Sequence, residues 1–231
     1  MLYYLFEFLE NHYDLPGAGV FQYISFRSAL AIITSLLVSL VFGGRIINLI
    51  RKKQIGEQVR KLGLEGEQAK SGTPTMGGLI ILSAILIPTL LFARLDNIYI
   101  QVMLISTIWL GVIGFIDDYI KVFRKDKEGL AGKFKILGQV GIGVIVGLIM
   151  VFHSDIVVKE KNIPTEIEGV YDFSENAQKS SITTIPFLKN NEFDYQYLTS
   201  WIGDGVKKYS WLLFIFVVIF VITAVSNGAN M

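Results

Sequence analysis

Long apolar stretches alternate with charged segments along the chain. Five stretches are almost free of Asp, Glu, Lys and Arg: 20–42, 76–93, 98–116, 136–152 and 209–225. A helix needs about 20 apolar residues to cross the roughly 30 Å hydrocarbon layer of a bilayer. The pattern therefore predicts an all-α integral membrane protein, a polytopic bundle of about five spans. Tyr209 and Trp211 stand at the start of the last stretch, where aromatic side chains anchor a helix at the interface.

Lys and Arg are concentrated in two connections, 43–75 and 117–135. Cytoplasmic loops carry this excess, so both connections are predicted to lie inside the cell. The N terminus and the outer loop 153–208 then lie outside, and the C-terminal residues lie inside. No basic side chain precedes Arg27 and no A-x-A-like cleavage site is present, so a removable signal peptide is not expected. Residues 2–9 are expected to form an interfacial helix.

Three local features predict structure rather than chemistry. Arg27 lies inside the first stretch, which indicates either an ion or proton relay or, as the favoured interpretation, a side chain that snorkels to the nearby outer surface. Gly143 and Gly147 have the GxxxG spacing of close helix packing. In the outer loop, 155–159 and 181–188 favour β-structure and predict a small hairpin.

Composition narrows the function classes. Apolar residues make up 52% and charged residues 18% of the 231 positions, and the mean hydropathy is +0.51. Soluble domains carry more charge, about a quarter of all residues. The net charge of +1 does not favour a nucleic-acid partner. Because the chain has no cysteine, disulfides, thiolate metal sites and cysteine nucleophiles are excluded. The expected environment is the lipid bilayer.

The first candidate site is the run KSGTPTMGG, from Lys70 to Gly78, where a predicted cytoplasmic loop enters the second stretch. Thr73 followed by Pro74 resembles a helix N-cap and first helical residue. Free backbone N–H groups and the helix dipole favour phosphate there, and Lys70 adds a positive charge. An ordinary capped membrane helix with small packing residues explains the same run.

The second candidate site is the acid pair Asp117 and Asp118, directly after the third stretch at the predicted inner boundary. On a continuing helix, Lys121 lies four residues after Asp117 and three after Asp118, and Lys125 shares its face. Paired carboxylates suit Mg²⁺, which binds one or two of them together with substrate phosphates and water. The pattern favours a phosphate site with Mg²⁺. The alternative is a salt-bridged end of a membrane helix.

Three motifs together resemble the phospho-N-acetylmuramoyl-pentapeptide transferases, within the polyprenyl-phosphate N-acetylhexosamine-1-phosphate transferase superfamily. They are KSGTPTMGG, DDYIKVFRKDKEGL followed by GKFK, and the terminal SNGAN. The resemblance implies transfer of phospho-MurNAc-pentapeptide from UDP-MurNAc-pentapeptide to undecaprenyl phosphate, which gives lipid I and UMP. It also implies Mg²⁺ as cofactor, a homodimer, and a site on the cytoplasmic face of the bacterial inner membrane.

The resemblance assigns roles to individual residues. Asp117 and Asp118 match the family's paired acids, which are expected to be catalytic and to hold the metal. The positions expected to bind substrate are Lys70, Thr75, Lys121, Lys125, Lys133, Asn227 and Asn230. By residue chemistry alone, the two asparagines either present amides to a ligand or cap the helix end. The sequence favours neither a one-step transfer nor a covalent phosphoryl-enzyme intermediate.

The chain departs from the family pattern after the asparagine motif. In the family a further aspartate, more spans and a histidine-rich cytoplasmic loop follow, and both halves form the active site. Residues 1–231 are therefore expected to be an N-terminal half that is inactive by itself. The alternatives are another polyprenyl-phosphate sugar-1-phosphate transferase and a non-catalytic membrane remnant. A third is a piece of a transporter or channel, which predicts charged residues inside several spans.

Overall fold

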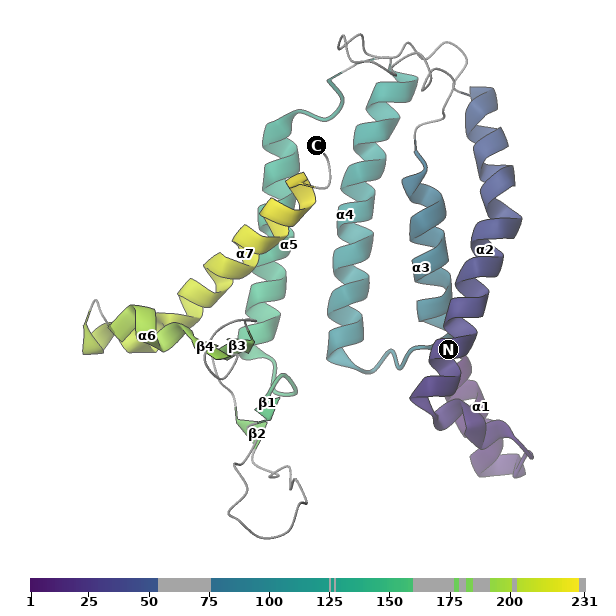
Figure 1. The fold of residues 1–231 in the computed structure, drawn as a ribbon, viewed down its shortest axis with the longest axis horizontal. Helices are drawn as coiled ribbons and strands as arrows, with labels where there is room; N and C mark the ends of the chain where they lie inside the picture. Colours follow the sequence, from purple (N-terminus) through teal and green to yellow (C-terminus); the bar gives the residue numbers. More distant parts are fainter. Residues whose placement is uncertain are drawn as a thin grey trace. The chain divides into compact units, whose positions relative to one another are not determined.

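The computed structural model describes residues 1–53, 76–124, 126, 128–159, 177–178, 182–184, 192–200 and 203–228 (Figure 1). The chain forms two compact units, Met1–Lys135 and Ile136–Met231. In chain order the elements are α1 (Leu2–Tyr13), the 3₁₀ helix η1 (Ala18–Gln22), α2 (Ile24–Lys53), α3 (Gly78–Phe92), α4 (Ile98–Phe123), α5 (Gly132–Phe152), β1 (Val158–Lys159), β2 (Ala177–Gln178), β3 (Ile182–Thr184), β4 (Glu192–Asp194), α6 (Tyr195–Ser200), the 3₁₀ helix η4 (Asp204–Tyr209) and α7 (Ser210–Gly228).

Each of the five predicted stretches coincides with a helix. Within the described ranges, four helices are long and apolar enough to cross a membrane: α2 over Ile24–Leu49, α4, α5 and α7. The remaining one, α3, is equally apolar but has 15 residues. The predicted polytopic helical fold is confirmed. Four helices run beyond the predicted apolar stretches: α2 continues to Lys53, α4 to Phe123 and α7 to Gly228, and α5 begins earlier, at Gly132.

In the first unit, α3 packs along α2 and also contacts α4 (Figure 1). The short helix α1 packs against η1, where Phe6 stacks on Phe21 with the ring centroids 3.8 Å apart. The amine of Met1 donates to the carbonyl oxygens of Leu90 and Leu91 at 2.8 Å and 3.2 Å. The helix predicted over residues 2–9 is therefore present, and it docks on the end of α3.

Arg27 is buried, with 8% of its surface exposed. Its Nη1 donates to the Phe92 carbonyl oxygen at 3.2 Å, and its guanidinium lies 4.8 Å from the centre of the Tyr3 ring. Phe92 ends α3, where the last carbonyls of a helix lack partners within the helix and carry partial negative charge. The snorkelling expected from the sequence is therefore wrong, because α1 and the end of α3 hold this charge instead of water.

In the second unit, α5 and α7 cross at two glycines (Figure 1). A Cβ added to Gly143 would lie 2.9 Å from the Cα of Ile219, and one added to Gly147 would lie 3.0 Å from Cγ1 of Ile215. Only residues without a side chain let two helix backbones approach this closely. The close packing predicted from the GxxxG spacing is confirmed.

Two small antiparallel sheets follow α5. β1 pairs with β2, and β3 pairs with β4 so that Thr183 lies opposite Phe193. Both predicted runs, 155–159 and 181–188, contain a strand, but each strand pairs with another segment and not with the other run. Tyr195 of α6 packs edge-on against Phe214 of α7, with the ring centroids 5.5 Å apart, and so joins this region to the helices.

Candidate active site

The candidate active site lies at the C-terminal end of α4, in the first unit. α4 begins at a cap, where the side chain of Asn97 accepts from the Tyr99 N–H at 2.9 Å and satisfies one of the free amides of the first turn. The helix continues without a break through Asp117 and Asp118 to Phe123. Successive residues on a helix point about 100° apart, so the two acids face different neighbours.

Asp117 is almost fully buried, with 6% of its surface exposed, and it holds two ammonium groups. Lys121 Nζ lies 2.6 Å from its Oδ2, across one turn of α4. Lys135 Nζ, from the start of α5, lies 2.8 Å from its Oδ1. A buried charge is unfavourable unless it is paired and hydrogen-bonded, and both conditions are met here.

Residues 128–131, which connect to the start of α5, fold back over Asp117. The Leu130 N–H donates to Asp117 Oδ1 at 2.8 Å. One residue earlier, Gly129 has φ +71°, and a Cβ on it would overlap the Asp117 carboxylate and the Lys121 side chain. The Asp126 carboxylate accepts from the Glu128 N–H at 3.0 Å and shapes the turn before it. Glycine is therefore the residue that lets the connection approach the acid so closely.

Asp118 has different surroundings. It is half-buried, and its carboxylate lies close to the backbone of Met76, two residues before α3. Among the residues that the structure describes, no ammonium or guanidinium group lies within 4.0 Å of this carboxylate. Lys121 and Lys135 act on it only as more distant charges. Asp117 thus has most of its acceptor positions occupied by other groups, whereas Asp118 has free acceptor capacity.

The structure brings some predicted residues together and places others apart. Lys121 joins Asp117 as the helical spacing predicted. Lys133 is exposed in the first turn of α5, whereas Lys135, which the sequence did not single out as a site residue, makes the ion pair. Asn227 belongs to the second unit. The other predicted substrate-binding residues, Lys70, Thr75, Lys125 and Asn230, lie outside the described residues.

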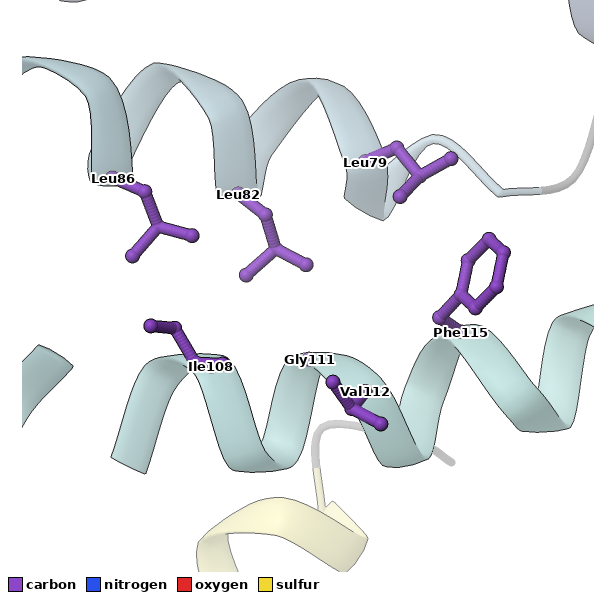
Figure 2. A pocket seen from close by; sticks show the side chains of 7 residues that line it. All are labelled: Leu79, Leu82, Leu86, Ile108, Gly111, Val112 and Phe115. Atoms are coloured by element: carbon purple, nitrogen blue, oxygen red, sulfur yellow. The ribbon is translucent and has the colours of Figure 1, made fainter. Parts of the chain in front are cut away.

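An apolar groove of about 310 Å³ lies between α3 and α4 in the same unit (Figure 2). Its lining residues are Leu79, Leu82 and Leu86 from α3 and Ile108, Gly111, Val112 and Phe115 from α4. Leu82 occupies the space beside Gly111, where a Cβ would lie 2.8 Å from its Cδ1. Since none of these side chains can form a hydrogen bond, the groove offers no polar group to a phosphate or a nucleotide.

Comparison with known proteins shows which proteins the chain is similar to. Residues 70–82, which include Met76, match the model described as "Phospho-N-acetylmuramoyl-pentapeptide-transferase signature 1". Over its whole length the chain is 58% identical to the phospho-N-acetylmuramoyl-pentapeptide-transferase of Flavobacterium psychrophilum, 55% to that of Flavobacterium johnsoniae and 57% to that of Parabacteroides distasonis. It covers 58%, 58% and 55% of these relatives and so spans a little over half of their length. Along all of its residues the chain is therefore similar to the phospho-N-acetylmuramoyl-pentapeptide-transferases, and residues 70–82 carry their first signature.

Proposed function

We propose that these residues form part of an enzyme that transfers phospho-MurNAc-pentapeptide from UDP-MurNAc-pentapeptide to undecaprenyl phosphate. The products are lipid I, for peptidoglycan synthesis, and UMP. One observation carries the proposal: Met76, within the family signature, lies close to Asp118, so the signature and the acid pair meet at one place. The relatives named phospho-N-acetylmuramoyl-pentapeptide-transferase support it.

Transfer between these substrates joins two anions, so charge repulsion is the main obstacle. A phosphate monoester has its second pKa near 6, and the acceptor therefore needs little help from a base. Lys121 and Lys135 place two positive charges beside the acid pair, where they can hold diphosphate oxygens and align the reacting groups. The other residues proposed to bind substrate, on the resemblance, are Lys70, Thr75, Lys125, Lys133, Asn227 and Asn230.

The donor set fits Mg²⁺ shared with substrate. Magnesium is usually bound by one or two carboxylates together with water and substrate phosphates. Asp117 and Asp118 supply that number, and in the described part of the chain no group of three or more His, Asp or Glu side chains forms an all-protein metal cage. When bound, Mg²⁺ supplies charge neutralisation at the diphosphate and at the departing UMP.

One substrate is a lipid and the other is soluble in water, so the site must lie at a membrane surface. The acid pair meets this requirement, because α4 is apolar over 98–116 and reaches the acids and lysines directly afterwards. The excess of Lys and Arg in 43–75 and 117–135 supports a cytoplasmic site in the bacterial inner membrane, with the N terminus outside. The homodimer is proposed from the resemblance alone.

Reconstitution tests the proposal. The chain is expressed in membranes with and without the part of the Flavobacterium psychrophilum relative that it does not match, and UMP release is measured with both substrates and Mg²⁺. We expect release only when both parts, both substrates and the metal are present, and a strong loss with Asp118→Asn. Release by residues 1–231 alone would show that the second part is not required.

A donor screen in the same assay separates the alternatives. Turnover of another UDP-linked sugar, but not of UDP-MurNAc-pentapeptide, would identify a different polyprenyl-phosphate sugar-1-phosphate transferase. An assembled protein that reaches the membrane and releases no UMP from any donor would contradict the transferase proposal and leave the non-catalytic remnant.

A further inference from the structure

The two acids of the pair differ in how much of their hydrogen-bonding capacity is in use. A carboxylate has about four lone-pair positions. In Asp117, Oδ1 accepts from the Leu130 N–H and from Lys135, and Oδ2 accepts from Lys121. About one position therefore remains for a metal or a substrate. Asp118 lies close to the Met76 backbone and, in the described part of the chain, has no cation within 4.0 Å.

The three donors on Asp117 come from three separate segments. Lys121 belongs to the next turn of α4, Leu130 to the connection 128–131, and Lys135 to the start of α5. One carboxylate thus fixes the path of the connection and the positions of two ammonium groups. Without it, both lysines would lose their counter-charge and the Leu130 amide would lose its acceptor, so the segments would separate.

Gly129 gives a second, independent sign that the connection is built to reach Asp117. Its φ of +71° lies in the left-handed region, and the space where a Cβ would stand is already taken by the Asp117 carboxylate and Lys121. An ion pair formed incidentally at a helix end would not require a glycine at that place. The glycine at position 129, its left-handed backbone and the ion pairs of Asp117 therefore all favour a connection that packs against this carboxylate.

We propose that Asp117 is a positioning residue, which holds Lys121, Lys135 and residues 128–131 in place, whereas Asp118 is the acid that touches the metal or the phosphate. This division of labour rests on the proposed transferase function and refines it. It predicts that changes at two adjacent, chemically identical residues have different consequences: displaced lysines for Asp117, and a weakened metal site for Asp118.

Thiol labelling tests the positioning role without requiring activity. Because the chain has no cysteine, Leu130→Cys introduces a single thiol and keeps the backbone N–H that reaches Asp117. We expect Asp117→Asn to raise the rate of maleimide labelling at position 130 about tenfold or more, as loss of charge-assisted hydrogen bonds predicts. Gly129→Ala should raise it similarly without changing any charge. Asp118→Asn is the matched control and should leave the rate unchanged.

The lysine partner provides a conservative rescue. Lys135→Met removes the ion pair to Asp117 Oδ1 and should also speed labelling, while Lys135→Arg, which can still pair with a carboxylate, should keep much of the protection. The double variant Asp117→Asn, Lys135→Met should label no faster than Asp117→Asn alone, since both changes remove the same Asp117–Lys135 ion pair.

Metal binding and kinetics test the other half of the proposal in the assembled enzyme. With Mn²⁺ as the probe, followed by its paramagnetic resonance signal, Asp118→Asn should weaken binding and lower kcat. Asp117→Asn should leave Mn²⁺ affinity close to that of the unchanged protein and should mainly raise KM for UDP-MurNAc-pentapeptide, about tenfold as for other groups that orient a site indirectly.

Two results would overturn the division of labour. One is unchanged labelling in Asp117→Asn, and the other is a loss of Mn²⁺ binding in Asp117→Asn as large as in Asp118→Asn. Absence of UMP release from the unchanged assembled protein would instead count against the transferase proposal, and the labelling comparison would still decide whether Asp117 holds the connection.

Discussion

The side-chain amides of Gln139 and Asn227 donate hydrogen bonds to each other, Nε2 to Oδ1 at 3.2 Å and Nδ2 to Oε1 at 3.0 Å. Gln139 is buried on α5, and Asn227 lies in the last turn of α7. The same two helices cross at Gly143 and Gly147, where the glycines allow close packing. The amide pair stabilises this packing of α5 against α7. Asn227 therefore has a structural partner in addition to its proposed role toward substrate.

Breaking the amide pair should loosen α5 from α7. Gln139→Leu and Asn227→Leu should each lower the free energy of unfolding by about 1 kcal/mol, the size of polar contacts between membrane helices. The double variant should cost no more than the worse single variant, because each change removes the same interaction. Denaturant titration in detergent micelles measures all three, and additive losses would show that the amides act independently.

Filling the helix crossing should be more damaging than filling an open site. Gly143→Ala places a Cβ against the Ile219 backbone and should lower the free energy of unfolding by about 1–3 kcal/mol, as overpacking does. Gly114→Ala on α4 is the control, since no heavy atom described lies within 4 Å of its added Cβ. There the better helix propensity of alanine should leave stability unchanged or slightly higher. Equal losses at both glycines would contradict the close crossing.

Acid should weaken the attachment of α1 to the loop after α3. Hydrogen bonds from Tyr4 and from Arg94 lower the pKa of the Asp96 carboxyl from 3.8 to about 2. Because this pKa is lower in the folded than in the unfolded chain, the contribution to stability is complete above about pH 5 and is lost as the pH falls toward 2. The unfolding midpoint of the unchanged protein should therefore fall across this range.

The variants Asp96→Asn and Tyr4→Phe isolate this effect from the titration of other acids. Asp96→Asn should start with a lower midpoint at pH 5 and lose less between pH 5 and pH 2.5, and Tyr4→Phe should lie between it and the unchanged protein. Parallel pH curves for all three proteins would rule out Asp96 as the titrating group.

Arg27 should matter more than Arg94, although both guanidinium groups lie over Tyr3, 4.8 Å and 5.2 Å from the ring centre. Arg27→Lys keeps the charge but loses the planar group that stacks on the ring and reaches the Phe92 carbonyl. We expect a loss of about 1–2 kcal/mol, as for a desolvated cation–π contact, and less for Arg94→Lys, whose side chain is exposed. Denaturant titration compares the two, and a larger loss for Arg94→Lys would be inconsistent with the burial of Arg27.

Hydropathy predicted the helices because a span must be apolar along its whole length, but it did not mark where polar residues continue a helix. The point at which α5 begins decides which lysine forms the ion pair with Asp117. Lys133 and Lys135 are two positions apart, which is a rotation of about 200° on a helix, so they point to nearly opposite sides and only one can face the acid. Which one does depends on where α5 begins, at Gly132, and on the turn at Gly129, and no local pattern specified either.

Arg27 shows a second limit of reading the sequence alone. A single arginine in an apolar stretch is usually explained by its own helix and the nearby water. Here its partners come from α1 and from the end of α3, two elements separated from it in the chain. A contact of this kind appears only once the helices are packed.

Because Asp117 pairs with both lysines, it affects which anions can bind to them. The carboxylate acts as a built-in competitor for any anion that approaches Lys121 and Lys135. A ligand with a single negative charge would have to displace the Asp117 carboxylate. It would replace one contact by a similar one, so it would gain little binding free energy. A diphosphate brings enough charge and oxygen atoms to satisfy both ammonium groups at once, so the arrangement discriminates by valence rather than by shape.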